Sequence, residues 1–332
     1  MSNKGFSAKA VRDGAMMTAL SVIFMLAGTY IPPVSLLGML LSGVPLAVLY
    51  IKDGLKPAVY AALVASLIYF VFTGNFLGAV LTMLAYGVPG LVSGICLKKK
   101  LSVYYAVFSV GAAFLFGFLC ELVSVKLFMG GIEDMFNQVF EMTEKNLKPM
   151  LASIAEKSGD ADLAKATEQI MESVKYTFKL YFPAMAITIS VVSGYLIYCF
   201  SGYILKKIRV FKGNIPPFNM LKAPKNFCNA SALILLVSLF VKNQMLSVVF
   251  LNVVFILYFL IGIAGFSFVD YKISRHIPKG FVRVVLYAAI FLFGAGLMSF
   301  AAMIFVLIGF ADSSMNFRNI CEEGEDLQSR EL

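Results

Sequence analysis

Apolar runs long enough to cross a membrane recur along this chain of 332 residues, separated by short polar turns. A helix of about 20 apolar residues spans a hydrocarbon core of roughly 30 Å. Helices are the expected structure there, because the core holds no water to satisfy the backbone. Charged residues make up 14% of the chain, well below the roughly 25% of a soluble domain. The sequence therefore predicts an all-α fold, a polytopic transmembrane helical bundle. About nine spans are expected, at residues 14–31, 34–51, 55–73, 76–97, 102–128, 178–208, 227–242, 245–272 and 281–310.

Lysine and arginine residues gather in one set of the turns between these spans. The turns on the other side, near residues 32, 74 and 243, contain only Lys242. By the positive-inside rule, we predict a multi-pass protein of the bacterial cytoplasmic membrane with a cytoplasmic N-terminus. The net charge of +9 then faces anionic membrane lipid, and no nucleic-acid partner is expected. The basic residues assigned to the cytoplasmic side are Lys4, Lys9, Arg12, Lys52, Lys56, Lys98, Lys99, Lys100, Lys206, Lys207, Arg209, Lys212, Lys222, Lys225, Lys272, Arg275, Lys279 and Arg283.

One long polar insertion, residues 129–177, interrupts the spans. Apolar residues from Ile132 to Phe140 follow helical spacing, which predicts an amphipathic helix that ends at Pro149 and the "KSGDAD" stretch. A second helix is expected from a cap at Asp160. The insertion lacks the lysine excess of the cytoplasmic turns, so we place this helical hairpin outside. The chain thus divides into spans at 1–128, the hairpin at 129–177, spans at 178–310 and a polar tail at 311–332.

Two copies of the triplet Gly-Val-Pro lie inside apolar spans. Gly43 and Pro45 belong to the first copy, and Gly87 and Pro89 to the second. Proline removes a backbone hydrogen bond and costs a helix interior about 3 kcal/mol. Transporters often build substrate sites from helices that are broken at matched positions. The triplets therefore indicate either a substrate site or two kinks that serve packing alone.

Glu121, in "FGFLCELVSVKLF", is the clearest ionisable residue within a span. A charged carboxylate at a helix centre costs about 2.5–3.5 kcal/mol on insertion scales, so such residues are often functional. Glu121 is the leading candidate to bind a cationic group or a proton; the alternatives are that it reaches outward to water or, while protonated, forms a hydrogen bond between helices. Asp270 lies near a cytoplasmic end, where we expect solvation.

Known catalytic and metal-binding patterns are missing from the sequence. It contains no HExxH, no GxSxG, no P-loop and no Rossmann glycine pattern, so we predict that the protein is not an enzyme and has no nucleotide cofactor. One histidine and five cysteines without a CxxC pair give no zinc or iron–sulfur site. We expect no cofactor and no metal.

Several segments, in this order, resemble the YybS-type family of bacterial membrane proteins, a domain of unknown function. They are "IPP" after the first span, "YFPAMAITISVVSGYLIYCFSGYILKKI" after the hairpin, "PPFNMLKAPKNF" and the closing "GFADSSMNFRN". The last segment is similar to the family's closing pattern, here Gly309, Asp312, Phe317 and Arg318. The activity of this family is not established, so the resemblance implies a topology more than a function.

Residues 10–208 also resemble the substrate-binding (S) subunits of energy-coupling-factor vitamin transporters. Those subunits begin with an Ala-x-x-x-Ala motif that contacts a transmembrane coupling subunit, and Ala15 and Ala19 match it by position. An "IP" loop and short Gly/Pro-broken helices follow. The resemblance implies an S-component-like six-helix core, to which this chain adds three C-terminal helices. The hairpin and these extra spans depart from the subunit pattern.

Two functions follow from these observations. The first is a small-molecule-binding or transport subunit without its own ATPase, with a site near Glu121 and the Gly-Val-Pro triplets. Its partners would be a coupling transmembrane subunit and an ATPase. The alternative is a non-transporting membrane scaffold for cell-envelope or division proteins, since rod-shape scaffold proteins use a related membrane fold.

Overall fold

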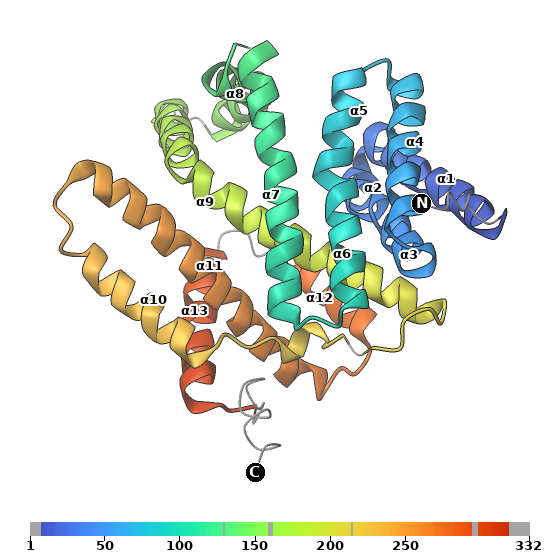
Figure 1. Cartoon of the computed structure of the whole chain (residues 1–332). Helices are drawn as coiled ribbons and strands as arrows, with labels where there is room; N and C mark the ends of the chain where they lie inside the picture. Colours follow the sequence, from blue (N-terminus) through green and yellow to red (C-terminus); the bar gives the residue numbers. More distant parts are fainter. Residues whose placement is uncertain (1–7, 129, 159–161, 214, 294–297, 319–332) are drawn as a thin grey trace. The chain divides into compact units, whose positions relative to one another are not determined.

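A computed structural model of the protein describes residues 8–128, 130–158, 162–213, 215–293 and 298–318 (Figure 1). Within these ranges the secondary structure contains helices and no strands, which confirms the all-α fold. The chain forms two compact units. The first comprises Met1–Lys179 and Ile189–Ile215, and the second comprises Leu180–Thr188 and Pro216–Leu332. The fourfold division expected from the sequence concerns membrane position, and it stays a prediction.

The first unit begins with two helix pairs in which a straight helix precedes a broken one (Figure 1). The break in the first pair falls at Gly43, and the break in the second is a π-helical segment. A longer straight helix follows the second pair. The elements are α1 (Ala8–Tyr30), η1 (Pro32–Val34), α2 (Ser35–Ser42), α3 (Val44–Asp53), α4 (Leu55–Thr73), α5 (Phe76–Thr82), η2 (Met83–Gly87), α6 (Val88–Lys98) and α7 (Val103–Phe128).

Seven helical stretches among the described residues are long and apolar enough to cross a membrane, by length and composition. They are Ala8–Tyr30, Pro32–Asp53, Leu55–Thr73, Phe76–Lys98, Val103–Phe128, Met171–Lys207 and Gln244–Ser274. These agree with seven of the nine expected spans. The expected span at 227–242 is instead the 14-residue helix α10 (Lys225–Ser238). Within the span expected at 281–310, the structure describes α12 (Gly280–Phe293) and α13 (Met298–Met315), and residues 294–297 between them lie outside the described residues.

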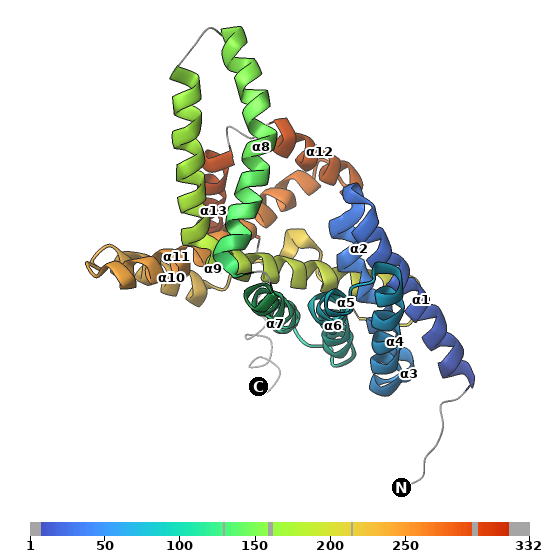
Figure 2. The same ribbon diagram turned by 90° about the horizontal axis from the view of Figure 1, so that it is seen from above.

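The polar insertion forms the expected hairpin, whose arms lie side by side in Figure 2. Its first arm, α8 (Ile132–Ser158), continues through Pro149 and ends in the "KSGDAD" stretch, so the end predicted at the proline is wrong and the end predicted at this stretch is confirmed. Proline removes only one backbone hydrogen-bond donor, so the hydrogen bonds of the turns on either side can maintain the helix. Its second arm belongs to α9 (Asp162–Lys207), one helix of 46 residues that runs on into the sixth span. Asp160 lies outside the described residues.

Side chains near the base of the hairpin fix its register. The rings of Phe136 and Phe140 both pack edge-on against Phe178, with centroids 5.5 and 5.8 Å away. Lys175 forms an ion pair with Glu144. Aromatic contacts are worth about 0.5–1.5 kcal/mol each beyond their buried area, more than a partly exposed ion pair. The aromatic cluster therefore determines how the two arms align.

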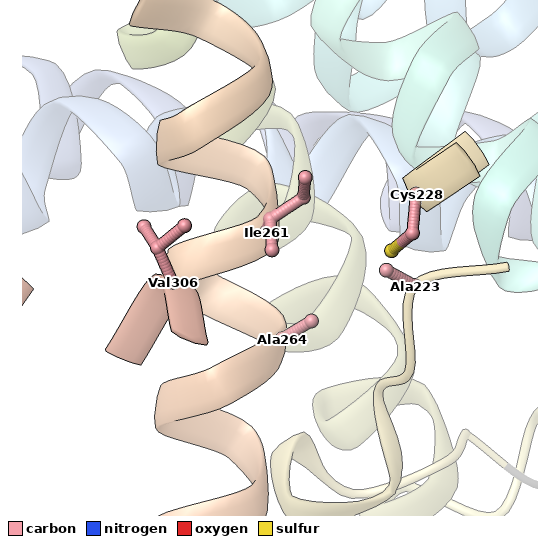
Figure 3. Packing of buried hydrophobic residues seen from close by; sticks show 5 residues of the cluster. All are labelled: Ala223, Cys228, Ile261, Ala264 and Val306. Carbon is pink, nitrogen blue, oxygen red and sulfur yellow. The ribbon is translucent and has the colours of Figure 1, made fainter. Parts of the chain in front are cut away.

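The second unit packs α10 and α13 against the long helix α11 (Gln244–Ser274). Glycines permit the contact between α11 and α13, because a Cβ on Gly265 would lie 2.9 Å from the backbone nitrogen of Gly309. Such close approach between small residues is typical of helix pairs in membranes. The core of this unit, shown in Figure 3, consists of Ala223, Cys228, Ile261, Ala264 and Val306.

Candidate functional site

The two Gly-Val-Pro triplets pack against each other in the first unit. A Cβ placed on Gly43 would lie 3.0 Å from the Cα atom of Gly90, and it would also clash with the carbonyl oxygen of Tyr86. Because both positions lack a side chain, the two backbones touch directly. Gly43, Pro45, Gly87 and Pro89 are all buried. The structure thus brings together the two breaks that the sequence singles out.

Helices α3 and α6 run parallel from these breaks. Gly43 contacts Gly90. One turn further along each helix, the Cα atom of Ala47 lies 3.0 Å from the ideal Cβ position of Gly94. At the far end the Lys98 ammonium lies 5.0 Å from the ring centroid of Tyr50. The contacts advance in the same direction on both helices, so α3 and α6 form a parallel pair in which Gly43 lies opposite Gly90, three residues beyond Gly87. The role of the triplets in substrate binding stays a prediction.

The second break is a π-helical turn, η2. The Val88 backbone N–H bonds to the carbonyl oxygen of Met83, five residues earlier, in place of the usual four. Pro89 follows directly and has no N–H to offer the preceding turn. The wide turn accommodates this missing donor without ending the helix. Single π-helical turns of this kind occur frequently at functional sites.

Glu121 lies on α7 one turn beyond Gly117, on the same face of the helix. Gly117 packs against η2, since its ideal Cβ would be 2.6 Å from the backbone nitrogen of Ala85. Glu121 therefore lies on the face of α7 that packs against the π-helical turn, and its carboxylate is half-buried. In the described part of the chain this carboxylate forms no ion pair.

An aromatic pair completes the surroundings of Glu121. The Tyr86 ring packs edge-on against Phe114 with centroids 5.4 Å apart. Phe114 lies seven residues before Glu121, two turns along the same face of α7. Sequence reasoning missed both aromatic residues. The available signal was the place of Tyr86 directly before the second triplet, but nothing in the sequence shows that its ring meets α7.

The candidate helix-contact residues lie elsewhere in the first unit. Ala15 and Ala19 are both exposed on α1, in a face that also exposes Val11 and Ile23. An exposed apolar face of a membrane helix contacts lipid or another helix. Its use as a contact for a partner subunit stays a prediction.

The closing sequence pattern forms a buried polar cluster in the second unit. The Arg318 guanidinium donates through Nε and Nη2 to Asp312 Oδ2, at 3.0 and 2.7 Å. Its Nη1 and Nη2 also donate to the carbonyl oxygens of Asn219 and Leu221, at 2.8 Å each. Nη1 donates further to the hydroxyl of Ser267 at 2.9 Å. The cluster therefore fastens the segment before α10 to α11 and to the end of α13.

The other members of the pattern support this cluster. Gly309 gives α11 room, since its ideal Cβ would lie 3.1 Å from the backbone nitrogen of Gly265. Phe317 packs on Phe268, whose ring centroid is also 5.8 Å from the Arg318 guanidinium. The first residues of the expected polar tail are thus part of α13 and of this buried cluster.

Asp270 is buried, so the expectation that water solvates it is wrong. Tyr287 donates a hydrogen bond of 2.7 Å to Asp270 Oδ1, and the Arg283 Nε atom lies 3.2 Å from the same oxygen. Both partners belong to α12, which covers the carboxylate. Arg283 and Tyr287 are far from Asp270 in the sequence, so the sequence alone does not predict this contact.

A third irregular helix occurs at Pro183 of α9. In a regular helix the Ala184 N–H would bond to the carbonyl oxygen of Leu180. Here the Asn252 side chain lies between them: its Oδ1 accepts from Ala184 at 3.1 Å, and its Nδ2 donates to Leu180 at 3.0 Å. The amide thus bridges two backbone groups next to Pro183 and ties α11 to this part of α9.

Apolar helices of membrane length, broken helices and buried polar contacts together define a polytopic helical membrane protein. A model of the predicted membrane protein family DUF2232 matches residues 19–313, so the chain belongs to that family. It is 26% identical over 308 residues to the "Uncharacterized protein YybS" of Bacillus subtilis (strain 168), which covers 88% of this chain and 96% of that protein. No solved structure matches the chain. The expected family is confirmed, whereas the resemblance to energy-coupling-factor subunits stays a prediction.

Proposed function

We propose that this membrane protein is a binding or transport subunit that holds a small polar or cationic molecule at Glu121. The observation that supports the proposal is the position of the Glu121 carboxylate, which faces the π-helical turn of a broken helix within the same unit. Transport would depend on a separate ATPase and a coupling subunit, and catalysis forms no part of the proposal.

The energetic cost of Glu121 favours a bound cation. A charged carboxylate within a span costs up to about 2.5–3.5 kcal/mol, and such residues normally have a partner. Among the described residues Glu121 has no basic partner, whereas Asp270 and Asp312 each have an arginine. A cationic ligand or a proton would supply the charge that the chain does not.

Ligand-induced stabilisation of the purified protein tests this proposal. The melting temperature would be measured in detergent against a panel of small organic cations and alkali metal ions. We expect a ligand that raises the Tm of the unaltered protein by mass action. Glu121→Gln should remove this shift, because the amide keeps the size and loses the charge. Glu141→Gln, at an exposed position of α8, is the matched control and should retain the shift. An equal shift in Glu121→Gln would contradict the proposal.

A non-transporting scaffold is the second candidate, and the exposed face of α1 with Ala15 and Ala19 favours it. Affinity purification from the protein's own membranes, followed by mass spectrometry, separates the two candidates. Recovery of an energy-coupling ATPase with its transmembrane partner supports the transport subunit. Recovery of envelope-synthesis or division proteins without an ATPase supports the scaffold. A bulky substitution, Ala19→Leu, should reduce whichever recovery depends on this face.

A further inference from the structure

We infer that the ligand of the Glu121 site is an organic ammonium ion, recognised by the carboxylate together with the aromatic ring of Tyr86. This inference rests on the function proposed above and names its substrate class. It depends on three residues of the first unit, Tyr86, Phe114 and Glu121, which the fold places around one glycine.

Gly117 creates the arrangement. Phe114, Gly117 and Glu121 recur at three- and four-residue spacing and so share one face of α7. Because Gly117 has no side chain, the backbone of Ala85 lies directly on it. The ring of the neighbouring residue, Tyr86, contacts Phe114 on one side of Gly117, and Glu121 lies one turn away on the other side of this glycine.

The backbone of Tyr86 is held from the opposite direction. Its carbonyl oxygen lies directly against Gly43, where any Cβ would clash. The π-helical turn that contains Tyr86 is thereby clamped between the glycine of α7 and the first Gly-Val-Pro break. Phe114 is buried and packs edge-on on the Tyr86 ring, which restricts the ring's orientation. Tyr86 and Glu121 both retain partial exposure, through which a ligand can reach them.

The chemistry of the three residues suits an organic cation better than a metal ion. Hard metal ions need several oxygen ligands, and transition metals need clusters of His, Cys or carboxylate side chains. No group of three such side chains lies together in the part of the chain that the structure describes. A single carboxylate beside an aromatic face instead matches an alkylammonium group, which aromatic faces attract by a cation–π interaction.

Choline and its uncharged isostere 3,3-dimethyl-1-butanol test whether binding requires a positive charge on the ligand. Binding would be measured by isothermal titration to the full chain in detergent, with potassium chloride at equal ionic strength as the metal-ion comparison. We expect choline to bind, and the uncharged isostere and potassium to bind at least about tenfold more weakly. Potassium binding as tight as choline binding would overturn the inference. Absence of choline binding would overturn it too, while leaving the panel test of Glu121 to decide the proposed function.

Variants of Tyr86 test whether its aromatic ring contributes to choline binding. Tyr86→Phe keeps the ring and should change choline affinity by less than about threefold, whereas Tyr86→Leu should weaken it about tenfold. Tyr105→Leu, at an exposed position of α7, is the control and should bind as the unaltered protein. If Tyr86→Leu does not fold, Phe114→Leu frees the ring orientation and should weaken binding by a smaller factor. Unchanged affinity in the folded leucine variant, combined with a loss in Glu121→Gln, would overturn the ring's role and leave the Glu121 function standing.

Discussion

Gly43 and Gly90 are in direct backbone contact where the parallel pair α3 and α6 begins, although 47 positions separate them in the sequence. The contact brings the two Gly-Val-Pro breaks together and fixes the carbonyl of Tyr86 in place. It is also the feature of the first unit that is most sensitive to a single methyl group.

Substitution of either glycine by alanine should destabilise the first unit. Gly43→Ala and Gly90→Ala each force the two backbones apart, and overpacking of this kind costs about 1–3 kcal/mol of the free energy of unfolding. The measurement is the Tm in detergent. Gly14→Ala is the control, since nothing lies within 4 Å of the ideal Cβ of Gly14. The Tm of this variant should equal that of the unaltered protein or be slightly higher. Equal Tm values in all three variants would show that the backbones do not touch.

Arg318 should be the most sensitive residue of the second unit. Removal of one partner from a buried, hydrogen-bonded ion pair costs about 3–5 kcal/mol, so Asp312→Asn and Arg318→Met should both lower the Tm strongly. Arg318→Lys should also fail to restore stability, because an ammonium group cannot reproduce the planar fork that contacts Asp312, Asn219 and Leu221. Thermal unfolding in detergent measures the effect. Arg12→Lys, at an exposed arginine that pairs with the buried Asp13, is the control and should cost under about 1 kcal/mol. A tolerated Arg318→Lys would contradict the buried cluster.

Asn252 should matter only because of Pro183. Asn252→Leu leaves the Ala184 N–H and the Leu180 carbonyl without their partner, and we expect a loss of about 1–2 kcal/mol. Pro183→Ala removes the ring that crowds the preceding turn, so we expect Ala184 to bond more strongly to Leu180. In a double-mutant cycle, the cost of Asn252→Leu should therefore shrink in the Pro183→Ala background. The same cost in both backgrounds would mean that the side chain does not compensate for Pro183.

The predicted topology can be tested by cysteine labelling in a background without native cysteines. Glu141→Cys lies on an exposed position of the hairpin, and Lys99→Cys lies in an exposed basic turn. By the positive-inside rule, a membrane-impermeant maleimide should label the first variant in intact cells and the second only after permeabilisation. Labelling of Lys99→Cys from outside would reverse the orientation.

Much of the fold follows from the sequence alone, because the length and hydropathy of a segment are local properties. They determine the all-α class and the bounds of seven membrane-length helices. The repeated triplet also marks both breaks, since proline acts on its own turn of helix. The hairpin was predicted for the same reason. The sequence does not predict that the second arm and the sixth span form one helix, α9. The residues change from polar to apolar along α9, and this change suggests a boundary where the helix in fact continues.

The candidate site was decided by tertiary structure. Glu121 is conspicuous in the sequence, but Tyr86 and Phe114 are two aromatic residues among many until Gly117 lets the π-helical turn lie on α7. Similarly, Asp270 was expected in water, and α12 buries it. In a chain that is 60% hydrophobic, hydropathy specifies which segments enter the membrane. It does not specify which faces meet, because that depends on close contacts between small residues far apart in the sequence.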